Sequence, residues 1–174
     1  MLKTETVQKQ EDKLLFFNNF ISPTHGPLDF EGVLDKLLEY LGNEPGMEYE
    51  LIIGTDSMPG GGSEAEFVSA IVIHRKQKGG IYFWSKRHEN ELHTLRQRIY
   101  EEALQSIKLA EQLIEKLKQR NITDFNLTIH VDVGPNGETK NMMKEIVGMV
   151  KGNGFEVRTK PESYGASSVA DRHT

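Results

Sequence analysis

The chain has 174 residues, no cysteine and a formal net charge of -5. This length suits one domain with its own core, and the lack of cysteine excludes a disulfide framework and thiolate chemistry. With no apolar run long enough to cross a bilayer and no signal-peptide pattern, we expect a cytoplasmic protein that does not enter a membrane. The negative charge argues against a broad, non-specific coat of nucleic acid but leaves a local basic groove open.

Residues 1–47 are predicted to form an N-terminal helical extension that packs on the main unit. A polar start is followed by an apolar patch that must dock, and Asp29 is placed to cap a helix with one apolar face. Because this segment is too short for a core of its own, we expect a single domain over residues 1–174, with its core at 48–174.

Three strands with short connections follow the extension, at about 49–56, 67–74 and 81–84. Each is an apolar or β-branched run closed by turn residues, with glycines at 60–62 and 79–80. Short connections of this kind imply antiparallel hairpin pairing between consecutive strands.

The second half of the core alternates helices and strands. A long helix at about 93–120 leads to a fourth strand that ends at Asp132. A second helix at 137–150, a fifth strand at 155–158 and one last helical turn complete the chain. The order β-β-β-α-β-α-β-α predicts the α/β class, with a five-stranded mixed sheet flanked by helices on both faces.

An aspartate closes each of two apolar strands: Asp56 ends the run that begins at Leu51, and Asp132 ends the run that begins at Leu127. Taken alone, either acid is explained as a residue that caps a turn. A right-handed crossover, however, places the fourth strand parallel to the first and beside it, so both acids lie at the same end of neighbouring strands. Like charges this close repel unless a cation compensates them, which predicts a metal site.

Glu102 is the candidate for a third carboxylate. At about 100° per residue it falls at the edge of the apolar arc of the long helix, close to Leu95 and Leu113, whereas Glu101 points away. A glutamate on this side needs a partner, and a metal ion would be one. The plainer alternative is an ion pair with Arg98 one turn earlier.

The C-terminal segment supplies a fourth acid, Asp171. Ser167 or Ser168 could cap a final turn that carries this side chain inward. A frayed, charged end is the other interpretation.

Four short segments resemble the bacterial YkuK-type family of ribonuclease H-like proteins. They are GTDS at 54–57, the helix start at 95–102, HVDVG at 130–134 and SSVADRHT at 167–174. In order and position the acids also resemble those of the ribonuclease H-like superfamily, and the resemblance covers nearly the whole chain. It implies a ribonuclease H-like fold and a four-acid site of Asp56, Glu102, Asp132 and Asp171.

Hard oxygen ligands of this kind suit two Mg²⁺ or Mn²⁺ ions, which permit hydrolysis of a phosphodiester. Asp56 would bridge both ions, Glu102 and Asp132 would complete the shell of one, and Asp171 that of the other. His173 could shuttle a proton or release product, or have no role beyond contact with solvent.

Basic and aromatic side chains offer contacts to nucleic acid, although structural roles explain them as well. Five basic residues near the C-terminal acids suit phosphate contacts or form a solvated charged face. They are Lys140, Lys144, Arg158, Lys160 and Arg172. Three aromatic residues of the third strand could stack on bases or belong to the core. They are Tyr82, Phe83 and Trp84.

The leading functional hypothesis is a hydrolase, a metal-dependent nuclease that cleaves RNA, RNA/DNA hybrid or structured DNA. One alternative is a catalytically inactive ribonuclease H-like module that binds nucleic acid or a protein. Another is a phosphatase or nucleotide hydrolase, because a fold does not fix a function. Nucleic acid is the expected partner, and a homodimer is the expected assembly.

Overall fold

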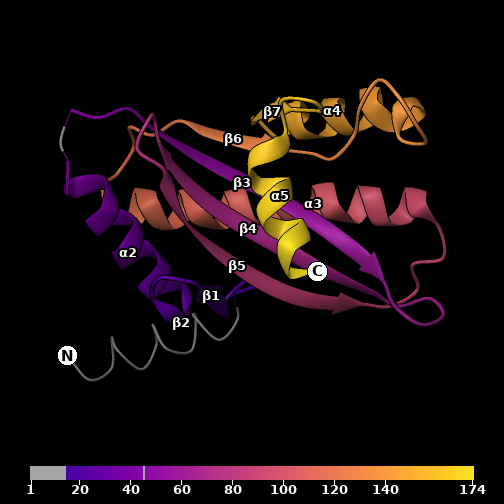
Figure 1. Cartoon of the computed structure of the whole chain (residues 1–174), viewed down its shortest axis with the longest axis horizontal. Helices are drawn as coiled ribbons and strands as arrows, with labels where there is room; N and C mark the ends of the chain where they lie inside the picture. The colour runs from indigo at the N-terminus through magenta and orange to yellow at the C-terminus, as the bar shows by residue number, and fades with distance from the viewer. Residues whose placement is uncertain (1–14, 45) are drawn as a thin grey trace.

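The computed structural model describes residues 15–44 and 46–174, with only the backbone described at 164, 165 and 167. One seven-stranded sheet has the order β2-β1-β5-β4-β3-β6-β7 (Figure 1). Its strands are β1 (Phe20–Ser22), β2 (Gly26–Leu28), β3 (Tyr49–Pro59), β4 (Ala65–Arg75), β5 (Gly80–Glu89), β6 (Leu127–His130) and β7 (Glu156–Arg158). The helices are α2 (Phe30–Gly42), α3 (Leu95–Gln119), the short 3₁₀ helix η1 (Lys140–Met142), α4 (Met143–Gly152) and α5 (Tyr164–His173).

The mixed sheet agrees with the predicted α/β class and strand order. β3, β4 and β5 form an antiparallel meander, while β6 pairs parallel to β3 and β7 parallel to β6. The expected crossover therefore places the fourth strand of the predicted core beside the first. Thr94 and Gln97 form a capping box where α3 begins, and Asp29 caps α2 as predicted, accepting a bond from the Gly32 N–H at 2.8 Å.

The prediction of five strands is wrong, because residues 20–28 form a hairpin within the segment assigned to a helical extension. β1 pairs with β2 and, through Ile21 opposite Trp84, adds both strands to the β5 edge. Phe20 and Ser22 are buried while Ile21 between them is 42% exposed. A three-residue strand is too short to display the period-two pattern from which strands are predicted.

The two faces of the sheet are covered unequally. α3 lies against one face and packs its buried residues, together with those of α2, into the main core. The other face carries α5, which crosses β3 and β4 in front of the sheet (Figure 1). Among the described residues, no helix has the length and apolar character required to cross a bilayer.

α5 is longer than the single turn expected for the tail, and it lies directly on the sheet. Ala166 and Ala170, one turn apart, are fully buried, and Ala170 packs with Val68 and Ala70. A Cβ atom at Gly54 would lie 2.7 Å from the Cβ of Ala166. Only glycine at this position leaves room for the helix, which brings the C-terminal segment next to the central strand β3.

Candidate active site

The register of β3 and β6 brings Asp56 and Asp132 together. The parallel pairing ends at Gly54 opposite His130, so each aspartate lies two residues beyond the last paired position of its strand. Neither is a strand end as predicted: β3 continues to Pro59 because β4 still pairs with it opposite Asp56, whereas β6 stops at His130. Asp56 is thus held by strand backbone and Asp132 by the loop that follows a strand.

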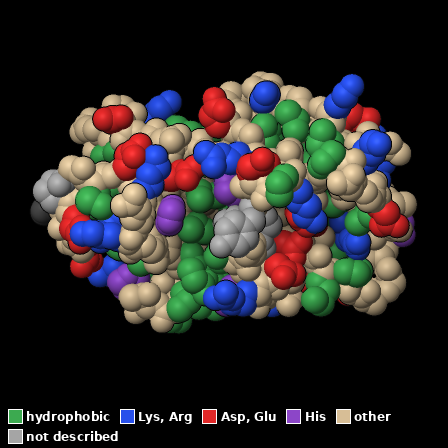
Figure 2. Space-filling model, turned by 45° about the horizontal axis from the view of Figure 1, so that its top comes forward, with side chains coloured by type: hydrophobic (Ala, Val, Ile, Leu, Met, Phe, Trp, Pro, Cys, Tyr) green, Lys and Arg blue, Asp and Glu red, His purple; other side chains and the backbone are tan. Residues whose placement is uncertain are grey.

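Asp171 completes a group of three aspartates around one pocket. This pocket, of about 290 Å³, opens beside α5 and is lined by the three aspartates and by four further residues. The four are Lys160, Pro161, Ser163 and Ser168. The space-filling view shows carboxylates gathered near the centre of this face, with lysine and arginine side chains beside them (Figure 2).

Glu102 approaches the same end of the sheet from the α3 side. It is 7% exposed, and its Oε1 accepts a bond of 2.6 Å from the Ser57 hydroxyl. A narrow cavity between the sheet and α3 is lined by both Glu102 and Asp132. Asp132 therefore borders the open pocket on one side and the Glu102 cavity on the other, and it links the four carboxylates.

The two adjacent glutamates of α3 have different partners. The hydrogen bond that the structure gives Glu102 runs to Ser57 on β3, and Arg98 one turn earlier acts only as a nearby positive charge. Glu101 is half-buried and accepts a bond of 3.1 Å from the Gln105 amide. Of the two adjacent glutamates, only Glu102 reaches the site.

Ionisation of the site is held back by burial and by like charge. Burial raises the pKa of Asp56 to about 6, and the negative charges of Asp171 and Asp132 add to the effect. Burial also raises the pKa of Glu102 to about 8; the Ser57 bond opposes this, while Asp56 and Asp132 reinforce it. A cation among these groups would favour their charged forms, which is the electrostatic condition for a metal site.

The donors suit hard divalent cations, because all four are carboxylates and no sulfur or imidazole ligand lines the acidic pocket in the described part of the chain. Within the same residues, no three acidic or histidine side chains form a preorganised cage for an ion. Bringing the aspartates to coordination distance requires a cation to offset their repulsion.

Contacts of its side chain and backbone fix Lys160 at the acidic pocket. Its ammonium Nζ lies 2.8 Å from Oδ1 of Asp132, and its backbone N–H donates a bond of 2.9 Å to the carbonyl of Val133. A Cβ at Gly134 would lie 3.0 Å from the Cβ of Lys160, so the absence of a side chain there lets the two segments run close together. This lysine places a positive charge on a carboxylate that a metal ion would also bind.

Lys160→Met is expected to raise the apparent affinity for Mn²⁺ several-fold, because the variant removes a cation that competes for Asp132. The affinity is measured by following free Mn²⁺ by electron paramagnetic resonance. Lys144→Met, on the exposed side of α4, is the matched control and should leave the affinity unchanged. An unchanged or weaker affinity in Lys160→Met would show that the lysine does not compete for the site.

The structure separates His173 from the acidic pocket. Its ring stacks on Trp84, with centroids 4.4 Å apart and an interplanar angle of 12°, and Nε2 lies 3.3 Å from the Tyr82 hydroxyl. Partial burial lowers the pKa of this histidine, and Arg172 and Lys86 lower it further. Of the aromatic residues considered for base stacking, Phe83 is fully buried in the core, and Trp84 and Tyr82 contact α5 through His173.

The fold agrees with a comparison against known proteins. The family model described as Ribonuclease H-like matches residues 32–174, a stretch that includes all four acids. The chain belongs to the ribonuclease H-like family. This ribonuclease H-like protein is 30% identical over 178 residues to the uncharacterized protein YkuK of Bacillus subtilis (strain 168), an alignment that covers 94% of this chain and 98% of the relative. No solved structure gives a significant match.

Ser57 was missed by the sequence analysis, as were Thr174, whose hydroxyl lies 3.5 Å from Oδ2 of Asp56, and the pairing of Lys160 with Asp132. Ser57 holds Glu102, and the alternation of β3 contains the signal: Gly54 faces α5, whereas Thr55 and Ser57 bond to α3. Lys160 was proposed only as a phosphate contact. Its pairing with Asp132 depends on the conformation of the loop after β7, for which the sequence has no periodic signal.

Proposed function

We propose that this protein is a metal-dependent nuclease that hydrolyses phosphodiester bonds in RNA, RNA/DNA hybrid or structured DNA. One observation carries the proposal: three aspartates line a single open pocket of a ribonuclease H-like fold, and a buried glutamate adjoins them through Asp132. Elements far apart in the sequence supply these acids, and a set of repelling carboxylates has no evident structural use.

The chain's own residues would hold two Mg²⁺ or Mn²⁺ ions through Asp56, Asp132, Asp171 and Glu102. When bound, such ions activate water and stabilise the leaving oxygen of a phosphodiester. β4 and β6 fix the β3 backbone before Asp56, and the Ser57 hydroxyl orients the Glu102 carboxylate. The open side of the pocket leaves the aspartates accessible to a polymeric substrate.

A binding module without catalysis is the second candidate, and one observation favours it. Lys160 already neutralises Asp132 at 2.8 Å, and in the described residues the acids form no preorganised cage. A protein of this kind would bind nucleic acid in any divalent metal without turning it over.

A substrate panel tests the proposal. The purified chain is incubated with single-stranded RNA, single-stranded DNA, an RNA/DNA hybrid, a four-way DNA junction and p-nitrophenyl phosphate, each in Mg²⁺, in Mn²⁺ and in EDTA. We expect cleavage of at least one polynucleotide in Mg²⁺ or Mn²⁺ and none in EDTA. Binding without cleavage would support the module instead, and turnover of p-nitrophenyl phosphate alone would indicate a phosphatase.

A further inference from the structure

A second pocket flanks α5 on the side opposite the acids. It has a volume of about 410 Å³, within the range of about 300–1,000 Å³ typical of small-ligand sites. The exposed Ser168 on α5 lines both this pocket and the acidic one, so the two cavities share this residue as part of their walls. In the space-filling view, apolar and histidine side chains adjoin the centre of the face on one side, and a cluster of carboxylates adjoins it on the other (Figure 2).

The second pocket combines an apolar floor with a basic rim. Ile52 and Val72, paired across β3 and β4, form the floor. Arg158 and Arg172 line the rim, and both are exposed to solvent. Glu162 also lines the pocket, and Glu50 lies 3.3 Å from the Arg158 guanidinium, so the arginines leave a smaller net positive charge than their number alone suggests.

Two histidines extend the floor. His130 is 4% exposed and sits between Gly54 and Arg158 in the strand register, while His74 is exposed at the far side. The exposed His74 ring beside an apolar floor suits contact with the face of a base, and guanidinium groups suit a phosphate, which they can bind through two parallel hydrogen bonds.

We propose that this pocket holds one nucleotide of the substrate strand next to the bond to be cleaved, with its base on the floor and its phosphate on Arg158 and Arg172. The inference rests on the proposed nuclease function and makes the substrate a polynucleotide that is single-stranded where it crosses α5. The strand would pass over Ser168, whose small side chain leaves the path open.

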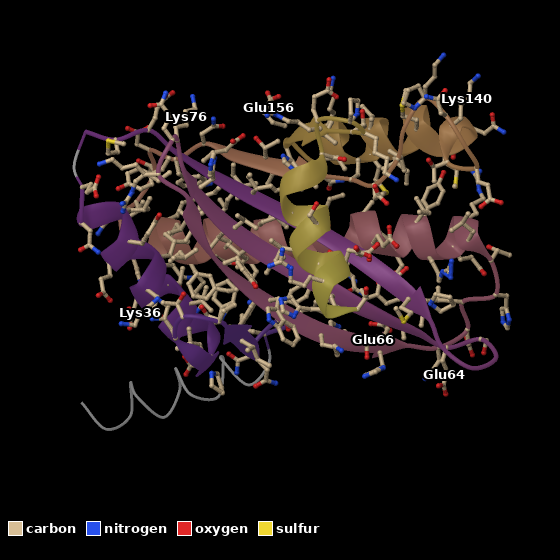
Figure 3. All side chains as sticks on the ribbon, viewed as in Figure 1. Lys36, Glu64, Glu66, Lys76, Lys140 and Glu156 are labelled. Atoms are coloured by element: carbon tan, nitrogen blue, oxygen red, sulfur yellow. The ribbon has the colours of Figure 1, made fainter. Side chains whose placement is uncertain are left out.

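The other two candidate phosphate contacts lie elsewhere and provide a matched control. Lys140 is on η1 and Lys144 is on α4, and neither lines the two pockets. The stick view places Lys140 at the outer corner of the molecule, well away from α5 (Figure 3). Lys140→Gln/Lys144→Gln therefore removes the same charge as Arg158→Gln/Arg172→Gln without touching the pocket.

The test measures binding of fluorescein-labelled single-stranded 12-mers of RNA and DNA by anisotropy, in the background of Asp132→Asn to prevent cleavage. The arginine pair is expected to lose at least about tenfold in affinity, and the slope of log K against log salt should become shallower by about 0.7 for each phosphate that is no longer neutralised. Arg172→Gln alone should show part of the loss in affinity. This single variant keeps the Arg158–Glu50 ion pair, so a folding defect from breaking that pair cannot explain its loss. The lysine pair should lose less affinity than the arginine pair for the same 12-mers.

Cleavage kinetics distinguish this inference from the nuclease function itself. With the acids intact, the arginine pair should raise KM for a 12-mer by a much larger factor than KM for bis(p-nitrophenyl) phosphate, which has no neighbouring nucleotide. If the wild type cleaves polynucleotides and the arginine pair keeps the wild-type KM and salt slope, the nucleotide pocket is wrong and the nuclease stands. If the wild type neither binds nor cleaves any polynucleotide, both proposals fall.

Discussion

Asp56→Asn is expected to reduce divalent-metal-dependent cleavage by at least about a thousandfold, a loss of roughly 4 kcal/mol of transition-state stabilisation. Asp56 lines the acidic pocket with Asp132 and Asp171 and is fixed on the central strand. Asparagine keeps the size of the side chain and removes the charge. Because burial and the charges of Asp171 and Asp132 raise the pKa of Asp56, the variant should be no less stable than the wild type in EDTA. Initial rates and thermal unfolding together separate catalysis from folding.

Glu101→Gln is the control for the loss of cleavage in Asp56→Asn, because it also replaces a carboxylate by an amide. Glu101 is adjacent to Glu102 in sequence, but it bonds to Gln105 and lines neither the acidic pocket nor the Glu102 cavity. It should keep the wild-type rate within about twofold. Full, metal-dependent cleavage by Asp56→Asn would show that the acidic pocket is not the catalytic site.

The stability of the wild type in EDTA is expected to fall by a few kcal/mol between about pH 5 and pH 9, chiefly because of Glu102. Burial raises the folded-state pKa of Glu102 from 4.5 to about 8. A group raised in this way contributes its stability fully below pH 4.5 and loses it as the pH rises through about 8. Asp56, with a pKa raised to about 6, adds to the early part of the fall.

Urea denaturation of Glu102→Gln at pH 5, 7 and 9 isolates the Glu102 contribution. The neutral amide cannot ionise, so the variant should show a flatter dependence and exceed the wild type in stability at pH 9. Glu101→Gln should retain the wild-type dependence. Parallel curves for the wild type and Glu102→Gln would mean that Glu102 is already ionised at neutral pH, and that its burial is not what controls its charge.

The positions of the central acids follow from local pattern and one topological rule. The apolar runs before Asp56 and Asp132 indicate strands, and the right-handed crossover makes those strands neighbours, as the register of Gly54 opposite His130 confirms. The helical arc places Glu102 toward the sheet, where the structure finds it buried. These inferences succeed because α3 is long and strongly periodic and because each apolar run is closed by turn residues.

The remaining features depend on contacts that have no periodicity. The β1–β2 hairpin is recognisable only from its docking on Trp84, and the full length and position of α5 only from the fit of Ala166 against Gly54. The Lys160–Asp132 pair joins two loops, whose conformations are set by the packed fold. α5 and the Lys160–Asp132 pair determine the walls and the net charge of the acidic pocket, although they do not change the order of the core strands.

A titration of thermal stability with Mg²⁺ or Mn²⁺, performed on the wild type and on Asp132→Asn, tests most directly whether the four acids form one metal site. An ion that binds only the folded state stabilises it increasingly with free concentration. We predict that the unfolding temperature of the wild type rises with free metal and that the variant responds far less. If neither protein responds, or if both respond alike, the carboxylates do not form the metal site on which the nuclease proposal depends.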